Sequence, residues 1–268
     1  MKISHKKVVE EHNQFAEEYD SWYEGSYNEY VREIEADILL RYLPKNKDIK
    51  ILDAAGGTGS LAIPLAEQGY QVYCIDLAEK MLSLGKVKAK KKKADKNIIF
   101  KRVDITNMKE FKDNCFDFTF CFGTALSYCD PEKALKEFKR VTKKNCFIIV
   151  DFKSLYRNLG MLIVKKDEKR ISKLLKTGLY SSDFHKYTEI NYRIGDIENL
   201  VKKFKFKLGY ILGKDIFYQY FSKLKSEDVD KIFNNQKNKK YFMDLDRQLR
   251  QNRNFIPLAI EIIAVLKK

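Results

Sequence analysis

The chain has 268 residues, 44% of them hydrophobic. This excludes a disordered chain, because it is enough to bury the core of one large globular domain or of a domain with an attached lobe. The 52 Lys and Arg residues outnumber the 37 Asp and Glu residues and give a net charge of +15. Such a charge would suit a nucleic-acid or membrane-surface partner. The lysines are spread through the chain, however, and this favours a generally basic, solvated surface.

The five cysteines form no C-x-x-C pair, and several stand in apolar runs. We therefore expect buried, reduced thiols, with neither disulfides nor a metal site. The N-terminus has no apolar signal core, and the most apolar late run, residues 255–266, contains Pro257 and Glu261 and is too short to span a bilayer. These features predict a cytoplasmic protein without a membrane segment.

Two helices are predicted over residues 5–43, and Pro44 ends the second. The first part is rich in aromatic residues, which cluster in the run Tyr19-Asp20-Ser21-Trp22-Tyr23. Such a cluster is suited to fasten a helix to the body of the protein.

A βαβ unit is predicted over residues 50–76. Its first strand is an apolar run that ends in Asp53 and breaks at once into the turn Ala55-Gly56-Gly57-Thr58-Gly59. A helix follows over residues 60–68, and the second strand ends in Asp76. Glycines stand where the backbone must turn sharply or approach a bound molecule closely, so this turn is the expected ligand cradle.

Two classes of cofactor fit the unit. The run from Gly57 to Ala62 matches the dinucleotide pattern G-x-G-x-x-G/A, with Asp76 near the spacing of the acid that binds ribose hydroxyls. A carboxylate at Asp53 instead suits a ligand with an ammonium and a sulfonium, and would sit badly beside a pyrophosphate. No Lys follows Gly59, which excludes a nucleoside-triphosphate P-loop.

Three more strands are predicted before residue 153, at 98–103, 117–122 and 146–152, with a helix at 131–141 between the last two. The strand at 98–103 also leads into a carboxylate, Asp104. The acids Asp53, Asp76 and Asp104 should then line one edge of a parallel sheet, where open α/β folds bind their ligands.

The remaining elements follow the same patterns. We predict helices at 155–175 and 197–204, a half-buried strand at 187–194, two polar helices within 222–254, and closing strands at 207–217 and 255–266.

Together these motifs resemble the class I S-adenosylmethionine (SAM)-dependent methyltransferases, and within them the small-molecule group with a type 11- or 25-like methyltransferase domain. The resemblance covers roughly residues 10–152 and the closing strands. The glycine turn resembles the family's first motif, an aspartate followed by x-G-x-G-x-G, except that Ala55 brings a methyl group to a crowded point of the turn. The runs 19–23, 76–82 and 122–128 resemble the family's lid, its Asp-Leu-x-x-x-Met-Leu motif and its segment after the fourth strand.

The resemblance implies a role for each matching residue. Asp76 would bind the ribose, Asp104 and the backbone N–H of Ile105 the adenine amino group, and the backbone carbonyl of Phe122 the methionine ammonium. The other implied cofactor-binding residues lie in the lid, the glycine turn and the start of the following helix: Tyr19, Tyr23, Asp53, Ala55, Gly57, Gly59, Leu77 and Met81.

The resemblance also implies a Rossmann-like, doubly wound α/β fold. Its seven-stranded mixed sheet would have helices on both faces and an antiparallel last strand. We expect an N-terminal helical lid at 1–44 and a SAM-binding core at 45–152. Substrate-lobe insertions, including strand 6, would occupy 153–254, and the closing strand 255–268.

The expected reaction is in-line transfer of a methyl group to an O, N or S nucleophile of a small molecule, with S-adenosylhomocysteine as the second product. The protein would mainly align and desolvate the reactants, and a base helps only if the nucleophile carries a proton. His185 and Tyr128 are the candidates for that role. Aromatic residues around them would wall the acceptor pocket: Tyr156, Tyr180, Phe184, Tyr187, Tyr192, Phe217 and Tyr218.

Three alternatives stay open at this point. The same core could methylate RNA or protein, which the charge of +15 favours. The chain could be a dehydrogenase that uses NAD or NADP, although Asp53 and Asp104 would then be unexplained. It could also be a SAM-binding protein without catalytic activity.

Overall fold

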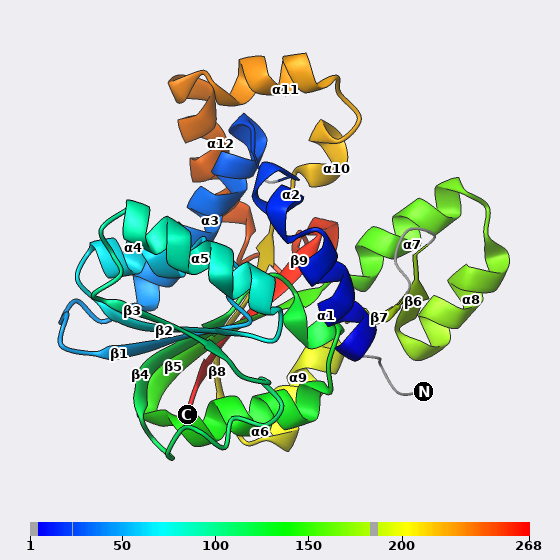
Figure 1. The fold of residues 1–268 in the computed structure, drawn as a ribbon. Coiled ribbons are helices and arrows are strands. Elements are labelled where there is room, and N and C mark those ends of the chain that lie inside the picture. Colours follow the sequence, from blue (N-terminus) through cyan, green and yellow to red (C-terminus); the bar gives the residue numbers. More distant parts are fainter. Residues whose placement is uncertain (1–4, 23, 183–186) are drawn as a thin grey trace.

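The computed structural model describes residues 5–22, 24–182 and 187–268. Seven strands form one sheet in the order β3-β2-β1-β4-β5-β9-β8 (Figure 1). The parallel strands are β1 (Lys50–Ala54), β2 (Gln71–Asp76), β3 (Ile98–Arg102), β4 (Phe116–Cys121) and β5 (Thr142–Lys153). Strand β9 (Glu261–Lys267) lies antiparallel between β5 and β8 (Lys207–Lys214). This confirms the predicted seven-stranded mixed sheet with an antiparallel last strand.

Consecutive residues of the central strands pack on opposite faces of the sheet, as the period of two in a strand requires. Ile51 belongs to the core shared with α3 (Ser26–Tyr42) and α4 (Ala62–Glu67). Leu52 belongs to the core shared with α6 (Pro131–Val141) and α9 (Ile194–Lys203). Helix α5 (Glu79–Lys91) lies beside α4, and Figure 1 shows this pair on the opposite face from α6 and α9. Both faces of the sheet are therefore covered.

The N-terminal segment has three helices, so the prediction of two was wrong. Helices α1 (His5–Gln14) and α2 (Ala16–Trp22) contact α5, whereas α3 packs against α11 and α12. Gly25 precedes α3 with a φ of 102°, a backbone conformation that favours glycine. That residue lets the chain change direction between the two groups of helices.

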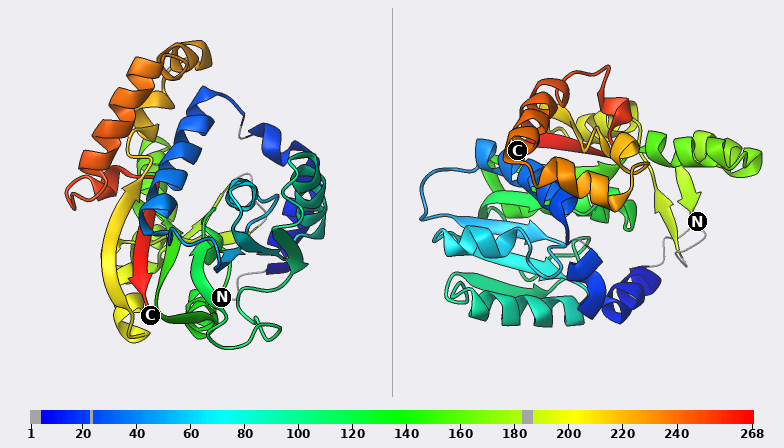
Figure 2. Two further views of the ribbon diagram at one scale, coloured as in Figure 1. Left: turned by 90° about the vertical axis from the view of Figure 1, so that its left-hand side faces the viewer. Right: turned by 90° about the horizontal axis from the view of Figure 1, so that it is seen from above.

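The segment after β5 forms a lobe on one side of the sheet (Figures 1 and 2). It contains α7 (Leu155–Val164), α8 (Glu168–Thr177) and the two-stranded sheet of β6 (Leu179–Ser181) and β7 (Thr188–Ile190). The single helix predicted over 155–175 is interrupted, because Lys166 has a φ of 54° and the Asp167 side chain caps α8 by accepting from the Arg170 N–H. The strand predicted at 187–194 is also shorter in the structure, where β7 spans only three residues and lies outside the main sheet.

Helices α10 (Tyr218–Phe221), α11 (Ser226–Phe233) and α12 (Gln236–Leu249) connect β8 to β9, and α11 and α12 pack beside α3. The closing strands are shorter than predicted. Residues 256–258, which include Pro257, form a 3₁₀ turn, so β9 begins only at Glu261.

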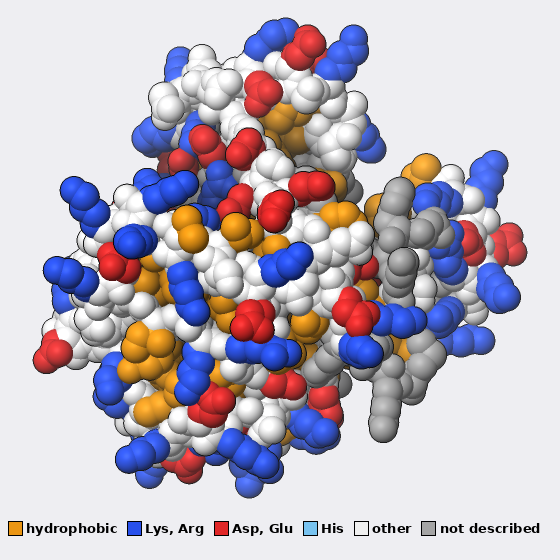
Figure 3. All heavy atoms as spheres, in the orientation of Figure 1, with side chains coloured by type: hydrophobic (Ala, Val, Ile, Leu, Met, Phe, Trp, Pro, Cys, Tyr) orange, Lys and Arg blue, Asp and Glu red, His pale blue; other side chains and the backbone are white. Residues whose placement is uncertain are grey.

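The distribution of charged side chains and the burial of the cysteines can be compared with the expectations from the composition. Figure 3 shows Lys and Arg side chains scattered over the visible face and interspersed with Asp and Glu. The thiols of Cys74, Cys121 and Cys129 are buried and free, but Cys115 and Cys146 are only half-buried. In the part of the chain that the structure describes, no helix is both long and apolar enough to cross a bilayer.

Candidate active site

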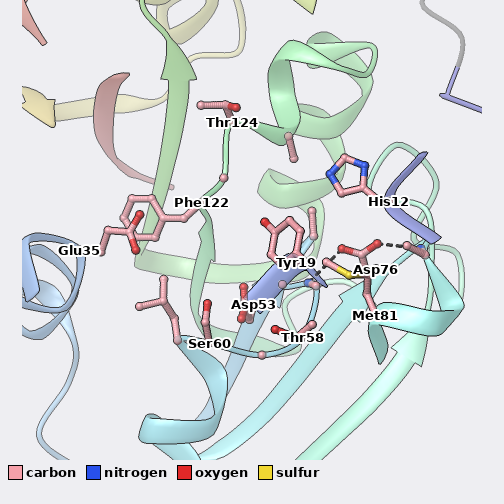
Figure 4. Close-up of a pocket in the computed structure, with 18 of the residues that line it drawn as sticks. His12, Tyr19, Glu35, Asp53, Thr58, Ser60, Asp76, Met81, Phe122 and Thr124 are labelled. Atoms are coloured by element: carbon pink, nitrogen blue, oxygen red, sulfur yellow. Dashed lines mark hydrogen bonds between the residues drawn. The ribbon is translucent and has the colours of Figure 1, made fainter. Parts of the chain in front are cut away.

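A cavity of about 1100 Å³ lies at the carboxyl edge of the parallel strands (Figure 4). Asp53 in β1, Asp76 at the end of β2 and Asp104 after β3 all line it. The three strand-end acids therefore share one cavity, because parallel strands end at the same edge of a sheet. Of the residues matched to the family's adenine-binding positions, Leu77, Met81 and Ile105 line it as well.

The glycine-rich turn after β1 forms the floor of this cavity. Ala55 adopts a φ of 59°, so this departure from glycine is accommodated in a left-handed conformation that costs an alanine roughly 1 kcal/mol. Gly57 and Gly59 also have positive φ values, of 56° and 78°. A Cβ on Gly57 would meet only the Met81 Cε within 4 Å, at 3.4 Å. The backbone of Gly57 is thus open to close approach by a ligand.

The Asp76 carboxylate braces the same turn. Its Oδ2 accepts a hydrogen bond from the Gly57 N–H at 3.0 Å, and its Oδ1 accepts one from the Ala78 N–H at 2.8 Å. Burial raises the pKa of Asp76, and these two backbone donors and His12 partly oppose the rise. One carboxylate therefore fixes the ligand cradle and the start of α5 together.

Asp53 makes the base of the cavity strongly acidic. Its side chain lies under the turn, where a Cβ on Gly56 would stand 2.5 Å from the Asp53 Oδ2. Burial raises the pKa of Asp53 well above its usual value, and the carboxylates of Asp76 and Glu35 raise it further. A cation bound near Asp53 would relieve this repulsion.

Helix α2 is tied to the glycine turn by a polar contact of three side chains. The Thr58 hydroxyl donates to the Asp20 Oδ1 at 2.8 Å, and the Lys88 ammonium in α5 donates to the Asp20 Oδ2 and to the Thr58 hydroxyl, each at 2.9 Å. Tyr19 lines the cavity and packs with Met81. This segment covers the cavity on the side of the glycine turn.

The far end of the cavity contains a buried lysine surrounded by carboxylates. The Lys214 ammonium lies 2.6 Å from the Glu35 Oε1 and 3.5 Å from the Asp151 Oδ2, and it also contacts Glu261. Asp151 in turn accepts from the backbone N–H groups of the loop after β4, at residues 123 and 124. This cluster holds α3, β5, β8 and β9 together at one point.

Two further tyrosine contacts complete the far end. The Tyr27 hydroxyl contacts the Asp215 carboxylate, and burial raises the pKa of Asp215 to about 7. The Tyr128 hydroxyl accepts a hydrogen bond from the Lys153 ammonium at 2.6 Å. Tyr128, Tyr187 and Tyr218 line the cavity.

Not every predicted acceptor residue lies in this cavity. Tyr180 and Tyr192 are buried in other clusters, and the Tyr192 hydroxyl donates to the backbone carbonyl of Leu126. His185, Tyr23 and Phe184 lie outside the described residues. The sequence analysis also missed the charged residues of the far end: Glu35, Lys153, Lys214, Asp215 and Glu261. Their one visible signal is that the last three stand at the boundaries of the apolar closing strands.

Comparisons with known proteins place this arrangement in a family. A family model described as a methyltransferase domain matches residues 52–150. An uncharacterized protein of Methanocaldococcus jannaschii is 33% identical over 158 residues, which is 59% of this chain and 68% of that protein. A demethylmenaquinone methyltransferase of Paenarthrobacter aurescens is 39% identical over 116 residues, 41% of this chain and 43% of that protein.

The fold agrees. The crystal structure of a SAM-dependent methyltransferase from Methanosarcina mazei superimposes with a TM-score of 0.59 at 17% identity, over 86% of this chain and 96% of that one. The chain belongs to the class I SAM-dependent methyltransferases and uses SAM as its methyl donor.

Proposed function

We propose that this enzyme transfers the methyl group of SAM to a small molecule bound at the far end of the cavity. The observation that carries the proposal is the size and extent of the cavity. Its walls run from Asp76 and Asp104 at one end to Arg157 and Tyr218 at the other, around about 1100 Å³. A pocket for one ligand typically has about 300–1,000 Å³, so this volume has room for an acceptor beside the cofactor.

The residues at the first end suit the nucleoside of SAM. The open backbone at Gly57 allows close contact, and Gly59 and Ala55 set the curvature of the turn. In the proposed assignment Asp76 accepts from the ribose hydroxyls. Asp104 and Ile105 bind the adenine edge, and Leu77 and Met81 enclose its faces.

The residues in the middle suit the amino-acid part of SAM. The Asp53 carboxyl would bind its ammonium, which the backbone carbonyl of Phe122 would also bind. Tyr19 would cover the cofactor from α2, and Tyr23 stays a prediction for the same role.

SAM supplies the electrophilic methyl group, so the protein has to position the acceptor rather than activate the donor. The aromatic walls at Tyr128, Tyr187 and Tyr218 exclude water and hold a flat or apolar body against the methyl group. Tyr128 lies just after β4 and is our candidate for the residue that orients the nucleophile, an O, N or S atom of the acceptor. His185 stays a prediction for that role.

Two observations favour a small molecule over RNA or protein. The basic side chains are dispersed over the surface shown in Figure 3 rather than gathered into one stripe. The relative from Paenarthrobacter is named for a small-molecule acceptor, demethylmenaquinone.

The test is to incubate the enzyme with methyl-labelled SAM and a cell extract separated into small-molecule, RNA and protein fractions. We expect label in the small-molecule fraction, and none with the Gly57→Val variant, whose branched side chain would occupy the open space at the turn. Label transferred only to RNA or protein would overturn the proposal.

A further inference from the structure

A buried polar network stands behind the acceptor end of the cavity. The Lys153 ammonium, at the end of β5, donates to the Tyr128 hydroxyl oxygen and to the Glu189 Oε2, each at 2.6 Å. The Asn158 amide donates to the other oxygen of Glu189 at 2.8 Å. The side chains of Lys153 and Glu189 are only 11% and 5% exposed. The network is therefore fixed by buried partners from three elements.

The network determines which way the Tyr128 hydroxyl points. An ammonium only donates, so the Tyr128 oxygen is the acceptor and its own hydrogen is directed elsewhere. Tyr128 and Lys153 both line the cavity. Within the described ranges, no side chain or backbone group accepts that hydrogen. Tyr128 thus presents a hydrogen-bond donor that a ligand in the cavity can satisfy.

The position of this donor is held from both sides. The Tyr128 ring makes an edge contact with the Tyr187 ring, with centroids 5.4 Å apart. The preceding residue is anchored too, because the Lys153 backbone N–H donates to the Ser127 hydroxyl at 3.3 Å. Burial lowers the pKa of Lys153, but Tyr128 and Glu189 outweigh this and leave the pKa above its usual value. Lys153 therefore stays an ammonium at neutral pH.

A second cation stands at this end of the cavity, where its charge also acts on the Glu261 carboxylate. Arg157, in α7, lines the same cavity, and its guanidinium lies 5.3 Å from the centre of the Tyr218 ring. Its Nε is buried and has no hydrogen-bond partner among the described residues. A buried donor on a charged group is costly when it is left unpaired, so this atom also requires an acceptor from a ligand.

We propose that the methyl acceptor carries an ionised hydroxyl, as on a phenol or an enol, and that its oxygen accepts from the Tyr128 hydroxyl beside Lys153. This inference rests on the proposed function and names the class of its substrate. A cationic amine fits poorly at this point, because an ammonium offers no acceptor atom to the Tyr128 hydroxyl and would lie beside the Lys153 ammonium. Lys153 is a positioning residue in this scheme, since it acts through Tyr128.

The test uses 4-nitrophenol as a probe, because its phenol and phenolate forms absorb at different wavelengths. The probe is titrated with base in the presence of the enzyme saturated with S-adenosylhomocysteine. We expect the bound phenolate to be preferred about tenfold, which lowers the pKa of the bound probe by about one unit. Tyr128→Phe and Lys153→Met should abolish the shift, and Lys153→Arg should restore part of it. Tyr220→Phe, at a tyrosine that is 56% exposed, should leave it unchanged.

Three results would overturn the inference: a probe that does not bind, a bound probe that keeps its solution pKa, or a shift that survives in both Tyr128→Phe and Lys153→Met. Tyr128→Phe protects the test against misfolding, because it keeps the ring and its contact with Tyr187. Calorimetric titration with SAM separates the two proposals. If SAM binds and the shift is missing, only the acceptor class is wrong, whereas an enzyme that does not bind SAM refutes the proposed function itself.

Discussion

Replacing Asp76 with Asn tests the cofactor site most sharply, because it changes charge and hydrogen bonding with almost no change in shape. The Asp76 carboxylate accepts from the N–H groups of Gly57 and Ala78 through its two different oxygens. An amide has only one acceptor oxygen. One of the two N–H groups therefore loses its partner in the variant, and this should lower the free energy of unfolding by about 1–3 kcal/mol.

Asp76→Asn should also weaken the binding of SAM. In the proposed site the same carboxylate accepts from the ribose hydroxyls, and losing one charge-assisted hydrogen bond costs roughly 1.5–3 kcal/mol. The dissociation constant of SAM should then rise by about ten- to a hundredfold. Because burial raises the pKa of Asp76, affinity of the wild type should also fall towards acid pH, where the carboxylate takes up a proton. The variant should lack this dependence.

Isothermal titration calorimetry with SAM measures the affinity, and urea denaturation measures the stability. Asp130→Asn is the matched control, since Asp130 also accepts from two backbone N–H groups, as the N-cap of α6. Asn caps a helix as well as Asp does, so that variant should keep both properties. A folded Asp76→Asn protein with wild-type SAM affinity at neutral pH would refute the assignment of the ribose to Asp76.

Other substitutions address stability and the cover of the cavity. Burial raises the pKa of Asp215 from 3.8 to about 7, so the protonated side chain stabilises the fold at low pH and this stability is lost as pH rises. In urea denaturation, the wild type should lose up to about 4 kcal/mol relative to Asp215→Asn between about pH 4 and pH 7. A difference in stability between the two proteins that stays constant with pH would contradict this. Gly56→Ala should cost about 1–3 kcal/mol because its Cβ would stand 2.5 Å from the Asp53 Oδ2, whereas Gly160→Ala, in open space on α7, should cost nothing. Lys88→Met removes the half-exposed ion pair with Asp20 and should lower the free energy of unfolding by less than about 1 kcal/mol. The amide hydrogens of α2 should nevertheless exchange faster. Unchanged exchange would show that the Lys88–Asp20 contact does not hold this helix.

The sheet and its ligand edge could be predicted because their signals are local. An apolar run that ends in an acid is visible within ten residues of sequence, and Asp53 and Asp76 each follow that pattern. Parallel strands then bring such acids to one edge without any further information. The predicted start of α6 at residue 131 is also correct, and its signal is local too, because Asp130 caps the helix and Pro131 is its first residue.

The acceptor end could not be predicted, because its contacts join distant parts of the chain. Lys214 meets Glu35 from α3 and Glu261 from β9, and nothing in the neighbourhood of any of these residues indicates the other two. The Lys153–Glu189 pair depends on how far β7 extends, and the period-of-two pattern overestimated that length. Side-chain caps such as Asp167 also divided a helix that the apolar spacing left continuous.

The position of β9 has a consequence for how the chain is assembled. Strand β8 lies at the edge of the sheet and joins it through β9. On its other side β9 pairs with β5, from Phe147 to Lys153. A ribosome completes β5 and β8 well before it makes β9, so a nascent chain passes through a stage with an open strand edge, which is the kind of surface that pairs with other chains. Because Ile260 and Glu261 also line the cavity, its far end is completed last. Binding of SAM should then draw newly made chains towards the closed sheet by mass action.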